Sequence, residues 1–108
     1  MNVVRINTEQ IKDWASFHLV CKEAFGFPEF YGANMNAWID CLSYLDSDDG
    51  MTRFNLSKDE RLFIEIMDIE NFNSRLPEIF DALVEWTAFV NNRYLESNEI
   101  PKIALLFL

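Results

Sequence analysis

Three short apolar runs along the chain predict three β-strands. They occupy residues 3–6, 62–67 and 102–108. The second run is interrupted only by Glu65, and the third, KIALLFL, has apolar residues on both of its faces. Runs without alternation are typical of central strands in a parallel sheet that helices cover. We therefore expect the second and third runs at the centre of such a sheet.

Apolar residues at steps of three and four predict amphipathic helices between these strands. The first stripe ends at Gly26 and Pro28 and consists of Trp14, Phe17, Cys21, Ala24 and Phe25. The last stripe follows Pro77, a residue that the first turn of a helix tolerates. Its members are Ile79, Leu83, Trp86, Val90 and Tyr94, and the acids Glu78, Asp81 and Glu85 form the opposite stripe.

A further helix is predicted from residue 35 to residue 45, with Asn34 as its N-cap. The side-chain oxygen of an asparagine can accept a hydrogen bond from a free amide of the first turn. One face of this helix is apolar and consists of Met35, Trp38, Ile39, Leu42 and Leu45. The other face carries Asn36, Asp40 and Ser43 at steps of four and three, so Asp40 is expected to point away from the core.

The order β-α-α-β-α-β, joined by crossover helices, predicts an α/β fold with a small parallel sheet. The polar stretch 46–61, which begins DSDDG, is expected to form a loop with a helical turn after Ser57. At 108 residues the chain fits one domain spanning 1–108.

The charge balance indicates a cationic partner. The net charge is −9, which would repel nucleic acid and anionic membranes. No Lys, Arg or His occurs in residues 23–52, whose acids are Glu23, Glu29, Asp40, Asp46, Asp48 and Asp49. An ordinary acidic surface that serves solubility would have the same composition, so charge alone leaves both interpretations open.

Two features predict a cytoplasmic protein. Cys21 and Cys41 lie between apolar neighbours, which is typical of small buried thiols in a reducing compartment. The start MNVVRINTEQ lacks the apolar run of a signal peptide, and no segment approaches the roughly 20 apolar residues of a membrane span.

Few residues could support catalysis, so we expect no enzyme, no cofactor and no metal. His18 lies beside the first apolar stripe, where a lone histidine is more often structural, although a pair with Cys21 is conceivable. A structural zinc site requires about four Cys or His ligands, and the chain has three such residues. The DSDDG segment has its glycine fifth instead of sixth, so it fails the calcium-loop pattern. A small hydrolase using Asp40 and acids of the last helix remains an alternative.

Two segments resemble the barstar family of intracellular ribonuclease inhibitors. They are RINTEQI, at the first strand, and FPEFYGANMNAWIDCL, which ends in the second helix. The similarity runs without a gap over about residues 2–45. It implies a three-stranded parallel sheet flanked by helices, in agreement with the pattern above. It also implies a protein that plugs the active site of a basic ribonuclease.

The resemblance also implies roles for particular residues. Asp40 would enter the cationic pocket and take the place of a substrate phosphate. Phe30 stands where the family has a contacting tyrosine, and Gly32 and Asn34 match a turn that approaches the partner, although Asn34 can also serve only as a cap. The remaining partner-binding candidates are Asn36, Ser43 and the peripheral Glu85.

This sequence departs from the family pattern at three places. Asn36 stands where a second acid is common, Ile39 replaces the aromatic residue before the key acid, and the acid-rich segment 46–60 has no clear counterpart. We therefore expect a ribonuclease inhibitor that forms a one-to-one complex, with a cognate toxin other than the best-known ribonuclease as one option, as for bacterial immunity proteins. The alternative is a binding module of the same fold for a cationic partner that is not a nuclease.

Overall fold

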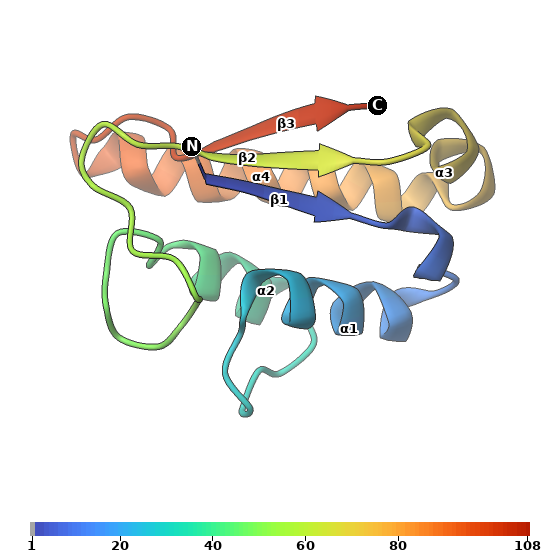
Figure 1. The fold of residues 1–108 in the computed structure, drawn as a ribbon, viewed down its shortest axis with the longest axis horizontal. Helices are drawn as coiled ribbons and strands as arrows, with labels where there is room; N and C mark the ends of the chain where they lie inside the picture. The colour runs from blue at the N-terminus through green and yellow to red at the C-terminus, as the bar shows by residue number, and fades with distance from the viewer. Residues whose placement is uncertain (1) are drawn as a thin grey trace.

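The structure, a computed structural model, describes residues 2–108 and contains one three-stranded parallel sheet. The strands are β1 (Asn2–Ile6), β2 (Leu62–Ile66) and β3 (Ile103–Phe107), in the spatial order β1-β2-β3 (Figure 1). Four α-helices and one short 3₁₀ helix accompany them: η1 (Thr8–Gln10), α1 (Trp14–Phe25), α2 (Met35–Leu42), α3 (Ile69–Arg75) and α4 (Pro77–Glu96). The predicted α/β class and the predicted order of elements are confirmed, with α3 as an addition.

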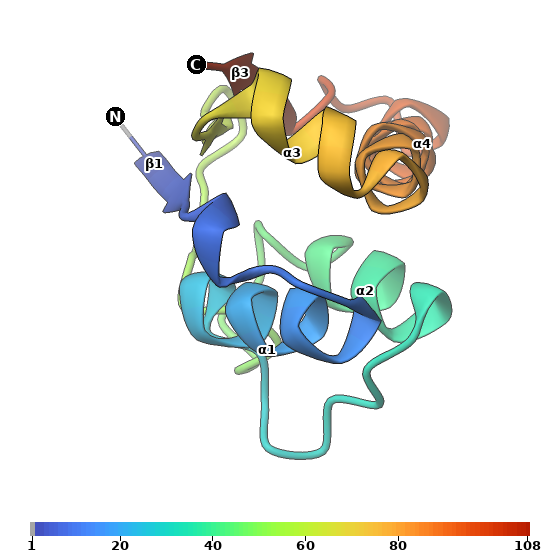
Figure 2. The ribbon, with the colours of Figure 1, turned by 90° about the vertical axis from the view of Figure 1, so that its right-hand side faces the viewer.

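The helices lie on one side of the sheet, as the two views together show (Figures 1 and 2). Side chains of β1 and β2 alternate accordingly, because successive residues of a strand point to opposite faces. The buried members, which form the floor of the core, are Val4, Ile6, Leu62, Ile64, Ile66 and Ile103. On the opposite face Arg5 pairs with Glu65 of the neighbouring strand at 3.1 Å.

The prediction that residues 102–108 form a central strand was wrong. The central strand is β2, and β3 lies at an edge of the sheet. Leu106 and Phe107, the last two residues of β3, are exposed, as is Leu108 after them. The apolar run was a correct sign of a strand, but the order of strands depends on how the crossover helices pack, which the run does not encode.

Helix α3 was missed because its sequence carries almost no periodic signal. Only Phe72 of its seven residues is fully buried. Asp68, which precedes the helix, has a left-handed backbone (φ 50°) and makes no side-chain capping bond. A short helix with one core residue and no cap cannot be recognised from an apolar stripe.

Helix α1 begins and ends with strong local signals. Asp13 and Ser16 form a capping box, in which the Asp13 carboxylate accepts the Ser16 N–H at 2.8 Å. Gly26 ends the helix in the left-handed region (φ 69°), and an added Cβ there would lie 2.8 Å from the Cβ of Arg53. Both the conformation and the close approach therefore require glycine at this position.

The segment between α2 and β2 is a loop, as predicted, with a turn at Ser57 instead of a helix. Its middle nevertheless belongs to the core, because Phe54 and Leu56 are buried. The ammonium of Lys102 is buried beneath the loop and donates to the backbone carbonyls of Ser57 (3.3 Å) and Lys58 (2.6 Å). Among residues 2–108, no helix is both long and apolar enough to span a bilayer.

Candidate partner-binding edge

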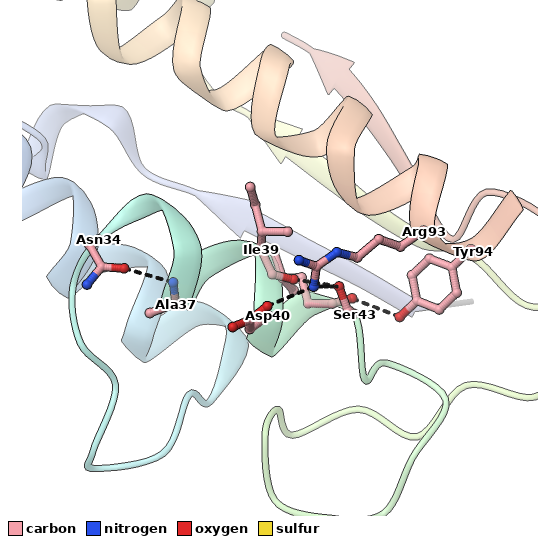
Figure 3. A network of polar contacts seen from close by, with 8 residues as sticks. Asn34, Ala37, Ile39, Asp40, Ser43, Arg93 and Tyr94 are labelled. Carbon is pink, nitrogen blue, oxygen red and sulfur yellow. Dashed lines mark hydrogen bonds and ion pairs between the residues drawn. The ribbon is translucent and has the colours of Figure 1, made fainter. Parts of the chain in front are cut away.

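The turn before α2 holds the predicted cap. The Asn34 Oδ1 accepts the N–H of Ala37 at 2.8 Å (Figure 3). The Asn34 Nδ2 donates to the Gly32 carbonyl at 3.3 Å. The left-handed residue of this turn is Ala33 (φ 51°), not Gly32. A non-glycine residue in that region costs of order 1 kcal/mol, and such residues cluster at functional sites. The turn is thus a locally strained feature of the motif.

The two aromatic residues before this turn point in opposite directions. Phe30 is 77% exposed, the largest exposure among the large hydrophobic side chains of residues 2–108. Tyr31 instead packs against Phe27, with ring centroids 4.6 Å apart, and its hydroxyl lies 2.6 Å from the Nδ1 of His18. Only Phe30 is therefore available to another molecule.

The central acid of the edge has an arginine neighbour from α4. The Arg93 Nη1 donates to the Asp40 Oδ1 at 2.7 Å and to the Ser43 Oγ at 3.2 Å (Figure 3). Ser43 in turn donates to the carbonyl of Ile39 at 2.7 Å. The Asp40 and Arg93 side chains are 56% and 50% exposed, so the pair faces solvent. The structure brings Asp40 and Ser43 together through Arg93, which was not among the predicted residues.

In the folded protein, basic side chains lie next to the acids of residues 23–52, a segment that has no Lys, Arg or His of its own. Arg93 reaches Asp40, and Lys22 lies 3.5 Å from Glu29. Both bases come from outside residues 23–52, so the count of charges along the chain is correct but does not describe the charges of the packed helices. The surface remains acidic beyond Arg93, where a shallow groove of about 420 Å³ is lined by the carboxylates Asp46, Glu96 and Glu99.

Two predicted residues extend the edge away from Asp40. Asn36 is exposed one turn earlier on α2, so it lies on the same face. Glu85 is exposed on α4, eight residues before Arg93, which corresponds to about 12 Å along the helix axis. Asn36 thus joins the central edge, whereas Glu85 lies at a distance from Asp40. Met35 was predicted on the core face of α2. Its side chain is 42% exposed, because Met35 is the first residue of the helix, at the N-terminal end.

The groups that could have supported catalysis are held in unreactive surroundings. His18 is buried against the rings of Trp14 and Trp86, and this burial lowers its pKa. Burial also raises the pKa of the Cys21 thiol to about 12 and that of Cys41 to about 11, so neither is a thiolate at neutral pH. Within residues 2–108, His18 and Cys21 share no hydrogen bond, and no three acids, histidines or cysteines cluster as a metal site would require.

Tyr94 fixes the end of α2 against α4. Its side chain points toward the end of α2 (Figure 3). The buried hydroxyl donates to the Leu42 carbonyl at 2.8 Å and accepts the Leu45 N–H at 3.0 Å. Sequence reasoning assigned Tyr94 to the apolar stripe and missed its polar role. A tyrosine within a stripe of aliphatic residues is a usable signal, since a buried hydroxyl needs a partner.

The fold is therefore a small α/β module in which a parallel sheet has its helices on one face and one of these helices presents an exposed acid. The family model described as Barstar (barnase inhibitor) matches residues 1–105, and the chain therefore belongs to the barstar family. At the level of the family, its members are inhibitors of barnase-type ribonucleases. A comparison with curated proteins gave no match.

Proposed function

We propose that this chain inhibits a basic ribonuclease by covering its active site with the exposed edge of α2. Asp40 enters the cationic pocket and occupies the position of a substrate phosphate. The complex has one copy of each protein, forms in the cytoplasm and involves no catalysis by the inhibitor. The observation that carries the proposal is the exposed, oriented carboxylate of Asp40 on a chain of the barstar family.

The contacts of Asp40 support this role. Its Oδ1 accepts the bond from Arg93, and its Oδ2 makes no hydrogen bond within residues 2–108. A carboxylate that a rigid helix already orients loses little freedom on binding, so more of the interaction energy appears as affinity. The free oxygen can then accept charge-assisted hydrogen bonds from the ribonuclease.

The surroundings of Asp40 supply the remaining contacts. We propose that Phe30 stacks on the partner, that Gly32, Asn34, Asn36 and Ser43 line the contact around Asp40, and that Glu85 contributes a peripheral charge. The groove with Asp46, Glu96 and Glu99 extends the acidic surface beside them. These acids favour a basic partner through long-range attraction.

Inhibition assays with barnase and a panel of other basic ribonucleases test the proposal. We expect the wild-type chain to inhibit at least one of them and Asp40→Ala to weaken that complex by more than about thirtyfold, the loss typical of a central interface residue. Asp49→Ala is the matched control, because it removes the same charge from the exposed loop. Its effect should stay within about threefold, as for a rim charge.

Two results would contradict the proposal in different ways. Equal losses in the two variants would mean that diffuse charge, and not the edge of α2, makes the interface. Inhibition of no ribonuclease, together with tight binding to another cationic protein, would favour the binding module instead. Substrate turnover by protein free of contaminating nuclease, if it disappears in Asp40→Ala or His18→Ala, would instead favour the alternative that the chain is a hydrolase.

A further inference from the structure

The guanidinium of Arg93 has more donors than its neighbours satisfy. Both of its hydrogen bonds within residues 2–108 come from Nη1, one to Asp40 and one to Ser43. An arginine has five N–H groups, and those of Nε and Nη2 meet no acceptor in this part of the chain. Because the side chain is 50% exposed, these donors face solvent in the free protein.

A partner that covers Asp40 must also cover Arg93. The two side chains are in direct contact at 2.7 Å, and they come from helices that Tyr94 holds together. Burying guanidinium N–H groups that have no acceptor is strongly unfavourable, and acceptors supplied by the partner reduce this cost. The Asp40 Oδ2 is free to receive a partner cation, so the pair between Arg93 and Asp40 has no need to break.

We propose that the partner carries a carboxylate beside its cationic centre and that this carboxylate binds the free N–H groups of Arg93. This inference rests on the proposed function and adds to it the chemistry of the partner. A carboxylate matches the two parallel N–H groups of a guanidinium, which a lysine cannot imitate. A partner with cations alone at this place would be repelled by Arg93. Arg93 therefore selects among basic partners.

Binding of Arg93 variants of this chain to a ribonuclease that the wild-type chain inhibits tests the inference. We expect Arg93→Met to weaken the complex by about tenfold or more, because a carboxylate of the partner is left buried and unpaired. Arg93→Lys should fall between Arg93→Met and wild type, since it keeps the charge and loses the paired donors. Affinity that is unchanged or higher in Arg93→Met would overturn the inference.

The direction of this effect is diagnostic. Loss of the Arg93 charge makes the net charge of the chain more negative. Long-range attraction alone should therefore strengthen the binding of Arg93→Met to a basic partner. Arg5→Met is the matched control, because Arg5 is also exposed, is also paired with an acid, and lies on the sheet face away from the helices. Arg5→Met should change the affinity by less than about twofold.

The double variant separates a contact made by Arg93 from an effect through Asp40. If Arg93 binds the partner itself, Asp40→Ala with Arg93→Met is weaker than Asp40→Ala alone. If Arg93 only orients Asp40, the second substitution costs nothing more, and the inference fails while the proposed function stands. Failure of the wild-type chain to inhibit any ribonuclease would instead remove the proposed function and the inference with it.

Discussion

The Tyr94 hydroxyl lies 2.8 Å from the Leu42 carbonyl, and the same oxygen accepts the N–H of Leu45 at 3.0 Å. One side chain of α4 thereby satisfies two backbone groups where α2 ends. Arg93, the residue before Tyr94, reaches Asp40 on the same pair of helices. The orientation of the binding edge therefore depends on a hydroxyl buried behind it.

Tyr94→Phe is expected to lower the free energy of unfolding by about 1–3 kcal/mol, because two buried backbone groups lose their partner while the ring still fills its space. Urea denaturation measures this change. Tyr44→Phe removes a hydroxyl from an exposed side chain two residues after α2 and should change stability by less than about 0.5 kcal/mol. Similar losses in both variants would mean that the Tyr94 bonds contribute nothing particular.

Asn34→Ala is expected to destabilise the protein by about 1 kcal/mol, since the free N–H of Ala37 loses its acceptor. Asn34→Asp keeps the cap and should retain most of the stability. Comparison of both variants in ribonuclease binding then separates the two roles of Asn34. If Asp restores stability but not affinity, the amide itself contacts the partner, whereas recovery of both assigns Asn34 to capping alone.

Stability should fall as the pH is lowered below about 6.5, the ordinary pKa of histidine. Burial of His18 lowers its pKa in the folded state, so between the folded and the unfolded pKa the unfolded chain binds more protons. The contribution of His18 is therefore complete above the unfolded pKa and is lost as the pH falls through the folded one. Denaturation of His18→Gln between pH 5 and 7.5 checks this, since the variant should be less stable but lack this slope. An equal slope in both proteins would assign the dependence to carboxylates.

Association with the ribonuclease should slow as salt is added, and dissociation should change little. Long-range attraction between the acidic edge and a basic partner acts before contact and is screened over about 8–10 Å at physiological ionic strength. Stopped-flow mixing at several NaCl concentrations measures both rates. An association rate that does not depend on salt would show that the acidic groove beside Arg93 has no steering role.

Local signals predicted α2 well. Its cap, its apolar face and the exposure of Asp40 depend on residues within one or two turns, and the structure has all three. The ion pair with Arg93 could not be predicted in this way, because 53 residues separate its members and only the packing of α2 on α4 brings them together. The edge position of β3 was missed for the same reason, since strand order is a property of the whole fold.

The hydrogen bonds of Lys102 limit where the loop between α2 and β2 can be shortened. Its buried ammonium finds its acceptors only where Ser57 and Lys58 place their carbonyls, so a deletion at these two residues would leave a charge inside the protein without partners. Residues 48–50 of the same loop are exposed, and no atom of residues 2–108 beyond its chain neighbours lies within 4 Å of a Cβ added at Gly50. We therefore expect an insertion at this exposed stretch to be tolerated better than one at Ser57 or Lys58.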